Sequence, residues 1–171
     1  MIDFRVAMRE DIPTMMEFVR SAQEWFRLSG IDQWQDGYPT AAVFEEDIAR
    51  GRSYVMESDG RVVATMCLSF DGEPTYSEIY EGEWLDDAPY AVVHRVVVDF
   101  SLRGRGLAQS LFQFAIKESL ARGIKSIRVD THKDNRPMQR LLEKLKFVHC
   151  GRIVLESGAD REAYQLQLYI K

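Results

Sequence analysis

The sequence predicts a mixed α/β fold in which a single layer of strands forms a central sheet flanked by helices. Three observations carry this prediction. Val96–Val98 is a run of β-branched residues typical of a buried strand, and apolar residues at helical spacing follow it. A further strand is expected at Ile127–Val129, and Asp59-Gly60 separates two apolar segments as in a β-hairpin. At 171 residues, this pattern predicts one layered domain spanning residues 1–171.

The N-terminal half predicts two helices and three strands. Apolar residues recur at helical spacing in both helices, and each helix meets a stop signal, Ser29-Gly30 in the first and Gly51 in the second. Thr40 is expected to be the N-cap of the second helix. The expected elements are a strand at Ile2–Ala7, helices from Ile12 to Ser29 and from Thr40 to Gly51, and hairpin strands at Ser53–Glu57 and Arg61–Phe70.

The C-terminal half continues the alternation. After Val96–Val98, a helix carries Leu107, Ala108, Leu111, Phe112 and Ala115 on one face and meets Gly123 at its end. Asn135 is suited to cap the helix that follows the next strand, with Pro137 in its first turn. Strands at Val148–Glu156 and Glu162–Ile170 should pair across Ser157–Asp160. The predicted order is β-α-α-β-β-β-α-β-α-β-β.

Composition excludes several classes of function. The net charge of −5 argues against a nucleic-acid binder that works through a basic face. No segment approaches the roughly 20 apolar residues of a membrane span, and the N-terminus does not resemble a secretory signal. Cys67 and Cys150 fit buried, reduced thiols in a cytoplasmic protein. His132 and His149 lack ligand spacing to any acid or cysteine, so no metal site is expected.

The segment Arg103-Gly104-Arg105-Gly106-Leu107-Ala108 lies between the Val96–Val98 strand and its helix. A glycine-rich turn that opens a helix directs backbone N–H groups, and the positive end of the helix dipole, toward one point. This arrangement suits an anion, above all a pyrophosphate. Arg103 and Arg105 add positive charge beside it. The pattern therefore predicts a binding site for a phosphate-bearing ligand.

Two other phosphate motifs fit less well. A P-loop is excluded because no Gly-Lys-Ser/Thr follows the glycines. A dinucleotide fold would match Gly104-x-Gly106 and an acid at Asp130, but the third glycine position is Gln109. The turn also lies five residues after Val98, and too few residues follow Asp130 for further βαβ units.

The turn fits [Gln/Arg]-x-x-Gly-x-[Gly/Ala], with Arg103, Gly106 and Ala108 at the defined positions, and it resembles the coenzyme A site of the GNAT superfamily of N-acetyltransferases. The element order is also the one this family shows, and the resemblance covers nearly the whole chain. It implies an acetyl-CoA-dependent N-acetyltransferase, with acetyl-CoA as co-substrate and a small-molecule amine as acceptor. Further matching positions are Val98-Asp99, Leu111-Phe112, Asn135 and Leu145-Lys146-Phe147.

The resemblance also implies which residues hold the co-substrate. The pantetheine arm would pair with the backbone of Val96, Val97 and Val98, where an N–H can polarise the thioester carbonyl. Asn135 would lie beside the co-substrate at the start of its helix. The pyrophosphate would be held by Arg103, Gly104, Arg105, Gly106, Leu107, Ala108 and Gln109.

Amine acetylation also needs a group that removes a proton from the acceptor. Ribosomal-protein N-terminal acetyltransferases of this superfamily place a carboxylate five residues before the Asn, which here is Asp130. His94 is the second candidate, because its ordinary pKa suits proton transfer near neutrality and regular alternation would place it on the face of Val96 and Val98. Both residues also have ordinary structural interpretations.

Two positions depart from the family pattern. Many relatives carry a Tyr seven residues after the Asn, as the acid for the departing thiolate, and this chain has Leu142. The residue before Phe147 is Lys146, where a Gly is usual. Tyr164 is a candidate substitute for the missing Tyr, although a Tyr at strand spacing is more often a core residue. The missing Tyr keeps an alternative function open, that of a non-catalytic acyl-CoA-binding sensor or regulatory domain. Homodimers are common in the family, but the sequence does not set the oligomeric state.

The segment Asp71–Tyr90 contains seven acidic residues and no Lys or Arg, with four aromatic residues interleaved. It is interpreted either as a solvated loop whose aromatic side chains pack on the sheet, or as a wall that attracts a cationic amine. A second loop, Ile31–Pro39, is rich in aromatic and amide side chains. The candidate substrate-binding residues in these loops are Gln33, Trp34, Tyr80 and Trp84.

Overall fold

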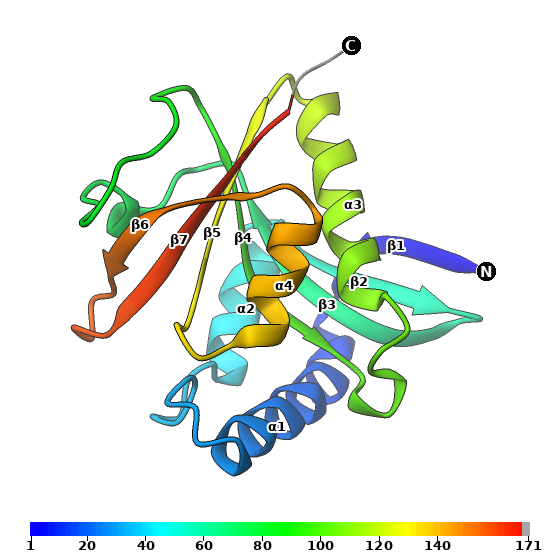
Figure 1. Ribbon diagram of the computed structural model, residues 1–171. Coiled ribbons are helices and arrows are strands. Elements are labelled where there is room, and N and C mark those ends of the chain that lie inside the picture. The colour runs from blue at the N-terminus through cyan, green and yellow to red at the C-terminus, as the bar shows by residue number, and fades with distance from the viewer. Residues whose placement is uncertain (169–171) are drawn as a thin grey trace. The chain divides into compact units, whose positions relative to one another are not determined.

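The computed structural model describes residues 1–168, in which seven strands form an open sheet of order β1-β2-β3-β4-β5-β7-β6, flanked by four α-helices (Figure 1). This confirms the predicted fold class and the predicted order of elements. The elements are β1 (Ile2–Val6), α1 (Ile12–Leu28), α2 (Ala41–Ala49), β2 (Ser53–Ser58), β3 (Arg61–Ser69), β4 (Ala91–Val98), α3 (Leu107–Ala121), β5 (Ser126–Thr131), α4 (Arg136–Lys144), β6 (Val148–Val154) and β7 (Asp160–Gln167). The predicted end of the last strand, at Ile170, lies outside the described residues.

The chain folds into two compact units. The first unit contains Met1–Leu68 and His94–Phe114, and the second contains Ser69–Val93 and the chain from Ala115 onward. The strand β4 and the helix α3 each contribute residues to both units. The prediction of one domain over residues 1–171 stays a prediction. None of the helices in the described part of the chain is long and apolar enough to cross a membrane.

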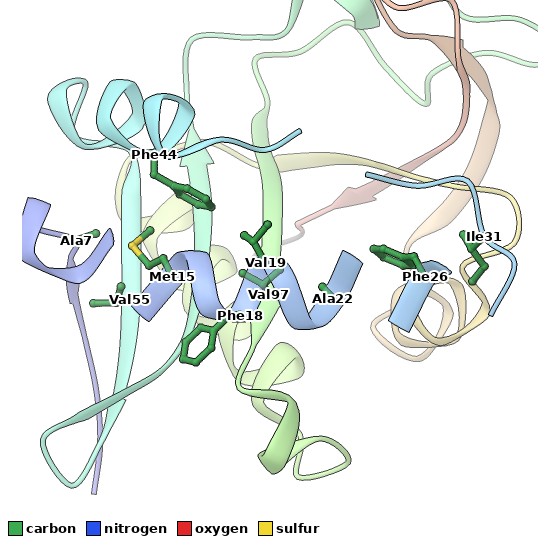
Figure 2. Close-up of a cluster of buried hydrophobic side chains, with 10 residues drawn as sticks. All are labelled: Ala7, Met15, Phe18, Val19, Ala22, Phe26, Ile31, Phe44, Val55 and Val97. Atoms are coloured by element: carbon green, nitrogen blue, oxygen red, sulfur yellow. The ribbon is translucent and has the colours of Figure 1, made fainter. Parts of the chain in front are cut away.

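The first unit is built on antiparallel pairing of β1 with β2 and of β2 with β3. The predicted hairpin turn is confirmed, since Asp59 and Gly60 both have left-handed backbone, with φ of 51° and 79°. Apolar side chains from α1, α2, β2 and β4 form the core of this unit (Figure 2). These buried residues are Ala7, Met15, Phe18, Val19, Ala22, Phe26, Ile31, Phe44, Val55 and Val97.

The second unit pairs β5 with β7 and β6 with β7, both antiparallel. Val129 lies opposite Tyr164, and Asp130 lies opposite Ala163. Opposed residues share a face of the sheet and successive residues alternate, so Asp130 and Tyr164 lie on opposite faces of this pair. In this unit β4 runs parallel to β5, with Ala91 opposite Ile127.

Several local predictions need correction or gain detail. Thr40 occupies the N-cap position of α2 with extended backbone, but its side chain makes no capping hydrogen bond. Asn135 does cap α4, because its Oδ1 accepts from Met138 N at 3.3 Å. Cys67 and Cys150 are buried free thiols, as predicted. Burial raises the pKa of Cys67 to about 11, which keeps that thiol protonated at neutral pH.

The strand β4 is longer than predicted and is not regular. It begins at Ala91, five residues before the Val96–Val98 run. Arg95, within it, has left-handed backbone with φ of 52°. Such a step interrupts the alternation of side chains, as in a β-bulge. The expectation that His94 shares a face with Val96 and Val98 assumed an unbroken strand and is therefore not supported.

Candidate active site

The glycine turn of the first unit has the backbone that the sequence predicts for an anion site. Gly104 and Gly106 are left-handed, with φ of 82° and 76°, and a Cβ on either would meet no atom within 4 Å. The helix α3 begins at Leu107, and its first i→i−4 bond runs from Ser110 N to Gly106 O at 3.0 Å. The N–H groups of the preceding helical residues therefore have no intrahelical acceptor.

The connection from β4 to this turn is itself ordered. Residues Phe100–Leu102 form one turn of 3₁₀ helix, and Asp99 Oδ1 caps it by accepting from Ser101 N at 3.0 Å. Asp99 Oδ2 also accepts from Arg61 at 2.9 Å. These contacts account for the spacing between the strand and the glycines that did not fit a dinucleotide fold.

Positive charge accompanies the turn. Arg103 and Arg105 are exposed, and the Arg103 guanidinium lies 4.7 Å from the centroid of the Phe100 ring. Left-handed glycines, open space beside the backbone, a helix N-terminus and two arginines together suit a pyrophosphate. The residues present thus fit the phosphate end of coenzyme A.

The candidate acceptor residues Gln33 and Trp34 lie in the same unit, in the loop before α2. The Trp34 ring packs edge-on to Phe26 of α1, with centroids 5.9 Å apart, and contacts the apolar core. Tyr38 packs against Trp34 at 6.5 Å, and its backbone oxygen accepts from Gln23 Nε2 at 3.1 Å. Residues 31–40, called the aromatic loop below, are thus held against α1 rather than free in solution.

In the second unit, the candidate base Asp130 has a partner that the sequence did not identify. The Tyr76 hydroxyl donates to Asp130 Oδ2 at 2.6 Å, and Tyr76 is only 1% exposed. Burial raises the pKa of Tyr76 well above its usual value, and the charge of Asp130 adds to the effect. Tyr76 therefore remains a proton donor across the neutral range, and Asp130 is the acceptor.

Tyr76 also connects Asp130 to the acidic segment. Its ring lies 5.2 Å from that of Trp84, and its backbone oxygen accepts from Trp84 Nε1 at 2.9 Å. Candidate residues 46 positions apart in the sequence, Trp84 and Asp130, are therefore joined through one buried tyrosine. In the sequence Tyr76 is one of four aromatic residues of that segment, and no spacing rule connects it to a residue 54 positions later.

A buried arginine anchors the same segment to β5. The Arg128 guanidinium lies 4.2 Å from the ring centroid of Trp84 and 4.0 Å from that of Tyr90, and its Nη2 donates to Asp86 O at 2.7 Å. Gln165 Nε2 also donates to Asp86, at 3.1 Å. The aromatic faces thus already contact a cation that belongs to the protein. The aromatic side chains therefore pack on the sheet, as the first interpretation expects, and five of the seven carboxylates of the segment are exposed. The role of these carboxylates toward an amine stays a prediction.

The middle of the segment is fixed to β6 by close backbone contact. Tyr80 and Arg152 exchange two backbone hydrogen bonds of 2.8 Å, and the Tyr80 hydroxyl donates to Glu78. A Cβ on Gly82 would lie 1.9 Å from the backbone oxygen of Cys150, which only glycine avoids. The segment is a docked part of the second unit.

Tyr164 does not take the place of the tyrosine that many relatives carry at the position of Leu142, because it does not lie on the same face of the sheet as Asp130. Tyr164 lies on the opposite face of the β5–β7 pair, is 5% exposed, and packs against His149 with centroids 5.2 Å apart. Burial raises its pKa. Leu142 is fully buried in its helix. The structure therefore favours the core interpretation of Tyr164.

The predicted site residues are divided between the units. The first contains His94, Val96–Val98, the glycine turn and the aromatic loop; the second contains Asp130, Asn135, Tyr80 and Trp84. Asn135, which the resemblance places beside the co-substrate, is 8% exposed and acts as the cap of α4.

Comparisons with known proteins agree with the predicted family and fold. The sequence model of the acetyltransferase (GNAT) family matches residues 19–147. An acetyltransferase of the GNAT family from Streptococcus agalactiae is 35% identical, with 99% of this chain and 96% of that one covered and a TM-score of 0.90. The protein yncA from Salmonella typhimurium, solved with its cofactor acetyl-CoA, shares the fold at 19% identity, covering 100% of this chain and 96% of its own, with a TM-score of 0.69.

A curated relative gives a shorter match. Streptothricin acetyltransferase from Escherichia coli is 39% identical over 61 residues, which are 36% of this chain. The match spans only 35% of that protein's length.

Proposed function

Because the chain belongs to the acetyltransferase (GNAT) family, we propose that it transfers the acetyl group of acetyl-CoA to the primary amine of a small cationic molecule. The observation that carries the proposal is the open, left-handed turn at Gly104 and Gly106 before the N-terminus of α3. We place the reaction in the cytoplasm, where two buried free thiols persist in reduced form.

Residues of the first unit would bind the co-substrate. The glycine turn and the first N–H groups of α3 would receive the pyrophosphate, with Arg103 and Arg105 adding charge. The backbone of Val96–Val98 would align the pantetheine arm, and one N–H there would polarise the thioester carbonyl, a contribution of about 10²–10³ in rate for a single donor. When bound, acetyl-CoA supplies an activated acetyl group.

Proton removal from the acceptor is assigned to Asp130 or His94. The ammonium group of the acceptor must lose one proton to a base before its nitrogen can form the C–N bond, and the nitrogen loses a second proton, to a base or to water, as the C–S bond breaks. The hydrogen bond from Tyr76 supports Asp130, because it orients the carboxylate that would accept the proton. His94 is the alternative in β4.

No side chain is assigned as the acid for the leaving thiolate. Leu142 has no proton to give, and Tyr164 faces away from Asp130 on its strand pair. A thiolate is a much weaker base than an amine, so it can leave unprotonated or take a proton from water. The cost should lie near the lower end of the 10²–10⁴ range typical of acid–base assistance, that is, about 100-fold.

The acceptor's charge is inferred from the Asp71–Tyr90 segment. Its seven carboxylates raise the local concentration of cations, and the segment contacts Asp130 through Tyr76. The aromatic faces of Trp84 and Tyr90 already contact Arg128, so we assign the attraction to the carboxylates.

A thiol-release assay with acetyl-CoA tests the proposal. The acceptors would be streptothricin, for which the matched E. coli protein is named, a polyamine, free lysine, and free glycine as an acceptor of zero net charge. We expect release with at least one cationic amine and little with glycine. The rate at low substrate should fall as salt rises beyond about 0.15 M, where screening acts within roughly 8 Å.

Two results would contradict parts of the proposal. Acetyl-CoA binding without thiol release for any acceptor would favour the non-catalytic acyl-CoA sensor. Equal rates for glycine and the cationic amines, without dependence on salt, would retain acetyl transfer but remove the role of the acidic segment.

A further inference from the structure

Arg95 is an unusual residue to find with left-handed backbone inside a strand. Its φ is 52°, whereas residues with a Cβ rarely adopt this region, and they do so mainly where surrounding contacts enforce it. The step lies directly before Val96–Val98, the run proposed to align the pantetheine arm. The direction in which that run presents its N–H groups therefore depends on how Arg95 is held.

Asp47 of α2 holds the Arg95 side chain. Asp47 accepts from Arg95 Nε at 2.8 Å and from Arg95 Nη2 at 2.7 Å, the two-pronged geometry that a guanidinium forms with a carboxylate. Asp47 is 1% exposed and the Arg95 side chain 11% exposed, so water has little access to the pair. Arg52 Nε donates to the same carboxylate at 2.8 Å. A buried ion pair that is joined by two hydrogen bonds is a rigid attachment point for the backbone of β4.

The third nitrogen of the Arg95 guanidinium, Nη1, contacts the aromatic loop. It donates to the Tyr38 hydroxyl at 2.7 Å. Tyr38 packs against Trp34, and Gln35 Nε2 in the same loop donates to Gln23 O of α1 at 3.0 Å. One guanidinium thus contacts α2, lies on β4 and holds the loop that carries the candidate acceptor residues.

We propose that Arg95 is a positioning residue that fixes the thioester-aligning strand through Asp47 and the acceptor loop through Tyr38. This inference rests on the proposed acetyl transfer and assigns a separate role to each of the two contacts of Arg95. The Asp47 contact serves the chemical step, because it sets the backbone before Val96–Val98. The Tyr38 contact serves acceptor binding, because it holds residues 31–40. The two contacts can be removed separately.

Three single variants test the two contacts. Arg95→Lys keeps the charge but loses the planar geometry on which both contacts depend. Tyr38→Phe removes the hydroxyl of the loop contact and leaves the Asp47 pair, and Arg50→Lys is the matched control. Arg50 is an exposed arginine at the end of α2, paired with Glu46. The measurements are kcat, KM for acetyl-CoA, KM for the best amine of the acceptor panel, and amide hydrogen exchange of the unliganded protein.

For Tyr38→Phe, we expect the amine KM to rise roughly 3- to 10-fold, the effect of one hydrogen bond, with kcat and the acetyl-CoA KM unchanged. Exchange should accelerate in residues 31–40 only. For Arg95→Lys, we expect kcat to fall by about 10-fold or more because the strand is misaligned, and exchange to accelerate in residues 94–98 as well. Arg50→Lys should match the wild type throughout.

A kcat for Arg95→Lys equal to that of Arg50→Lys, in an active wild type, would overturn the inference while leaving acetyl transfer intact. So would a Tyr38→Phe variant whose loop exchange and amine KM do not change, a result that remains available if Arg95→Lys fails to fold. A wild type that neither binds acetyl-CoA nor releases thiol would overturn the proposed function, and this inference with it.

Discussion

Replacing Tyr76 by Phe removes one hydroxyl from the second unit and little else. The ring contacts with Trp84 remain, and the 2.6 Å hydrogen bond to Asp130 Oδ2 is lost. A bond to a charged group contributes about 1.5–3 kcal/mol. Asp130 is half-buried, so water replaces part of the lost bond, and we expect a loss near the lower end, about 1.5–2 kcal/mol.

Urea unfolding at pH 7 measures this loss, and thermal unfolding should show a decrease of roughly 3–8 °C for a chain of this size. Tyr80→Phe is the control for stability in the same segment. Tyr80 is 41% exposed and its hydroxyl donates to Glu78 at 2.8 Å, so water can replace this bond and its loss should cost clearly less stability than the loss of the Tyr76 bond. If Asp130 is the base, Tyr76→Phe should also lower kcat and leave the acetyl-CoA KM unchanged.

Equal losses of stability in the two variants would refute the reasoning. They would mean that the Tyr76 hydroxyl does not hold the Asp130 carboxylate, and the support that this contact gives to Asp130 as the base would disappear.

Three further predictions concern the same unit and the proton transfer. Gly82→Ala should destabilise the fold by about 3 kcal/mol in urea unfolding, because its Cβ would lie 1.9 Å from Cys150 O; a loss under about 1 kcal/mol would contradict the close docking. The pKa of Tyr76 is raised by folding, so its contribution to stability is complete below about pH 10 and is lost as pH rises further. The difference in stability between the wild type and Tyr76→Phe should therefore narrow between pH 7 and pH 11, and a difference that stays constant would contradict this prediction. Asp130→Asn or His94→Gln should lower turnover by about 10²–10⁴ with acetyl-CoA affinity unchanged; full activity in both would place the base elsewhere.

The parts of the fold that sequence predicted are those set by local chemistry. Asp59-Gly60 specifies its turn because both residues tolerate left-handed backbone, and the structure has both in that region. Asn135 specifies the start of α4 because its side chain can accept from the first turn. Apolar spacing and glycine stops then place the other elements, which is why their order was predicted in full.

The parts that sequence could not predict depend on contacts between distant residues. Tyr76 is an ordinary aromatic residue until the fold places it against Asp130, 54 positions away. Arg95 has no residue-type preference for left-handed backbone, and its conformation is explained only by Asp47, 48 positions earlier. Thr40 shows the opposite case, since a favoured capping residue occupies the expected position without making the bond.

Titration calorimetry with acetyl-CoA tests the co-substrate site most directly, using the wild type, Gly106→Glu and Gly158→Glu. Both glycines are left-handed, with φ of 76° and 86°, and both have open space at the Cβ position, so the two variants share charge and backbone strain. Gly158 lies in the turn between β6 and β7, whereas Gly106 lies where the pyrophosphate is proposed to bind. We predict that Gly158→Glu binds like the wild type and that Gly106→Glu loses more than about 100-fold in affinity, that is, over about 2.7 kcal/mol. Equal affinities in all three proteins, or tight binding of a nicotinamide dinucleotide in place of acetyl-CoA, would contradict the assignment.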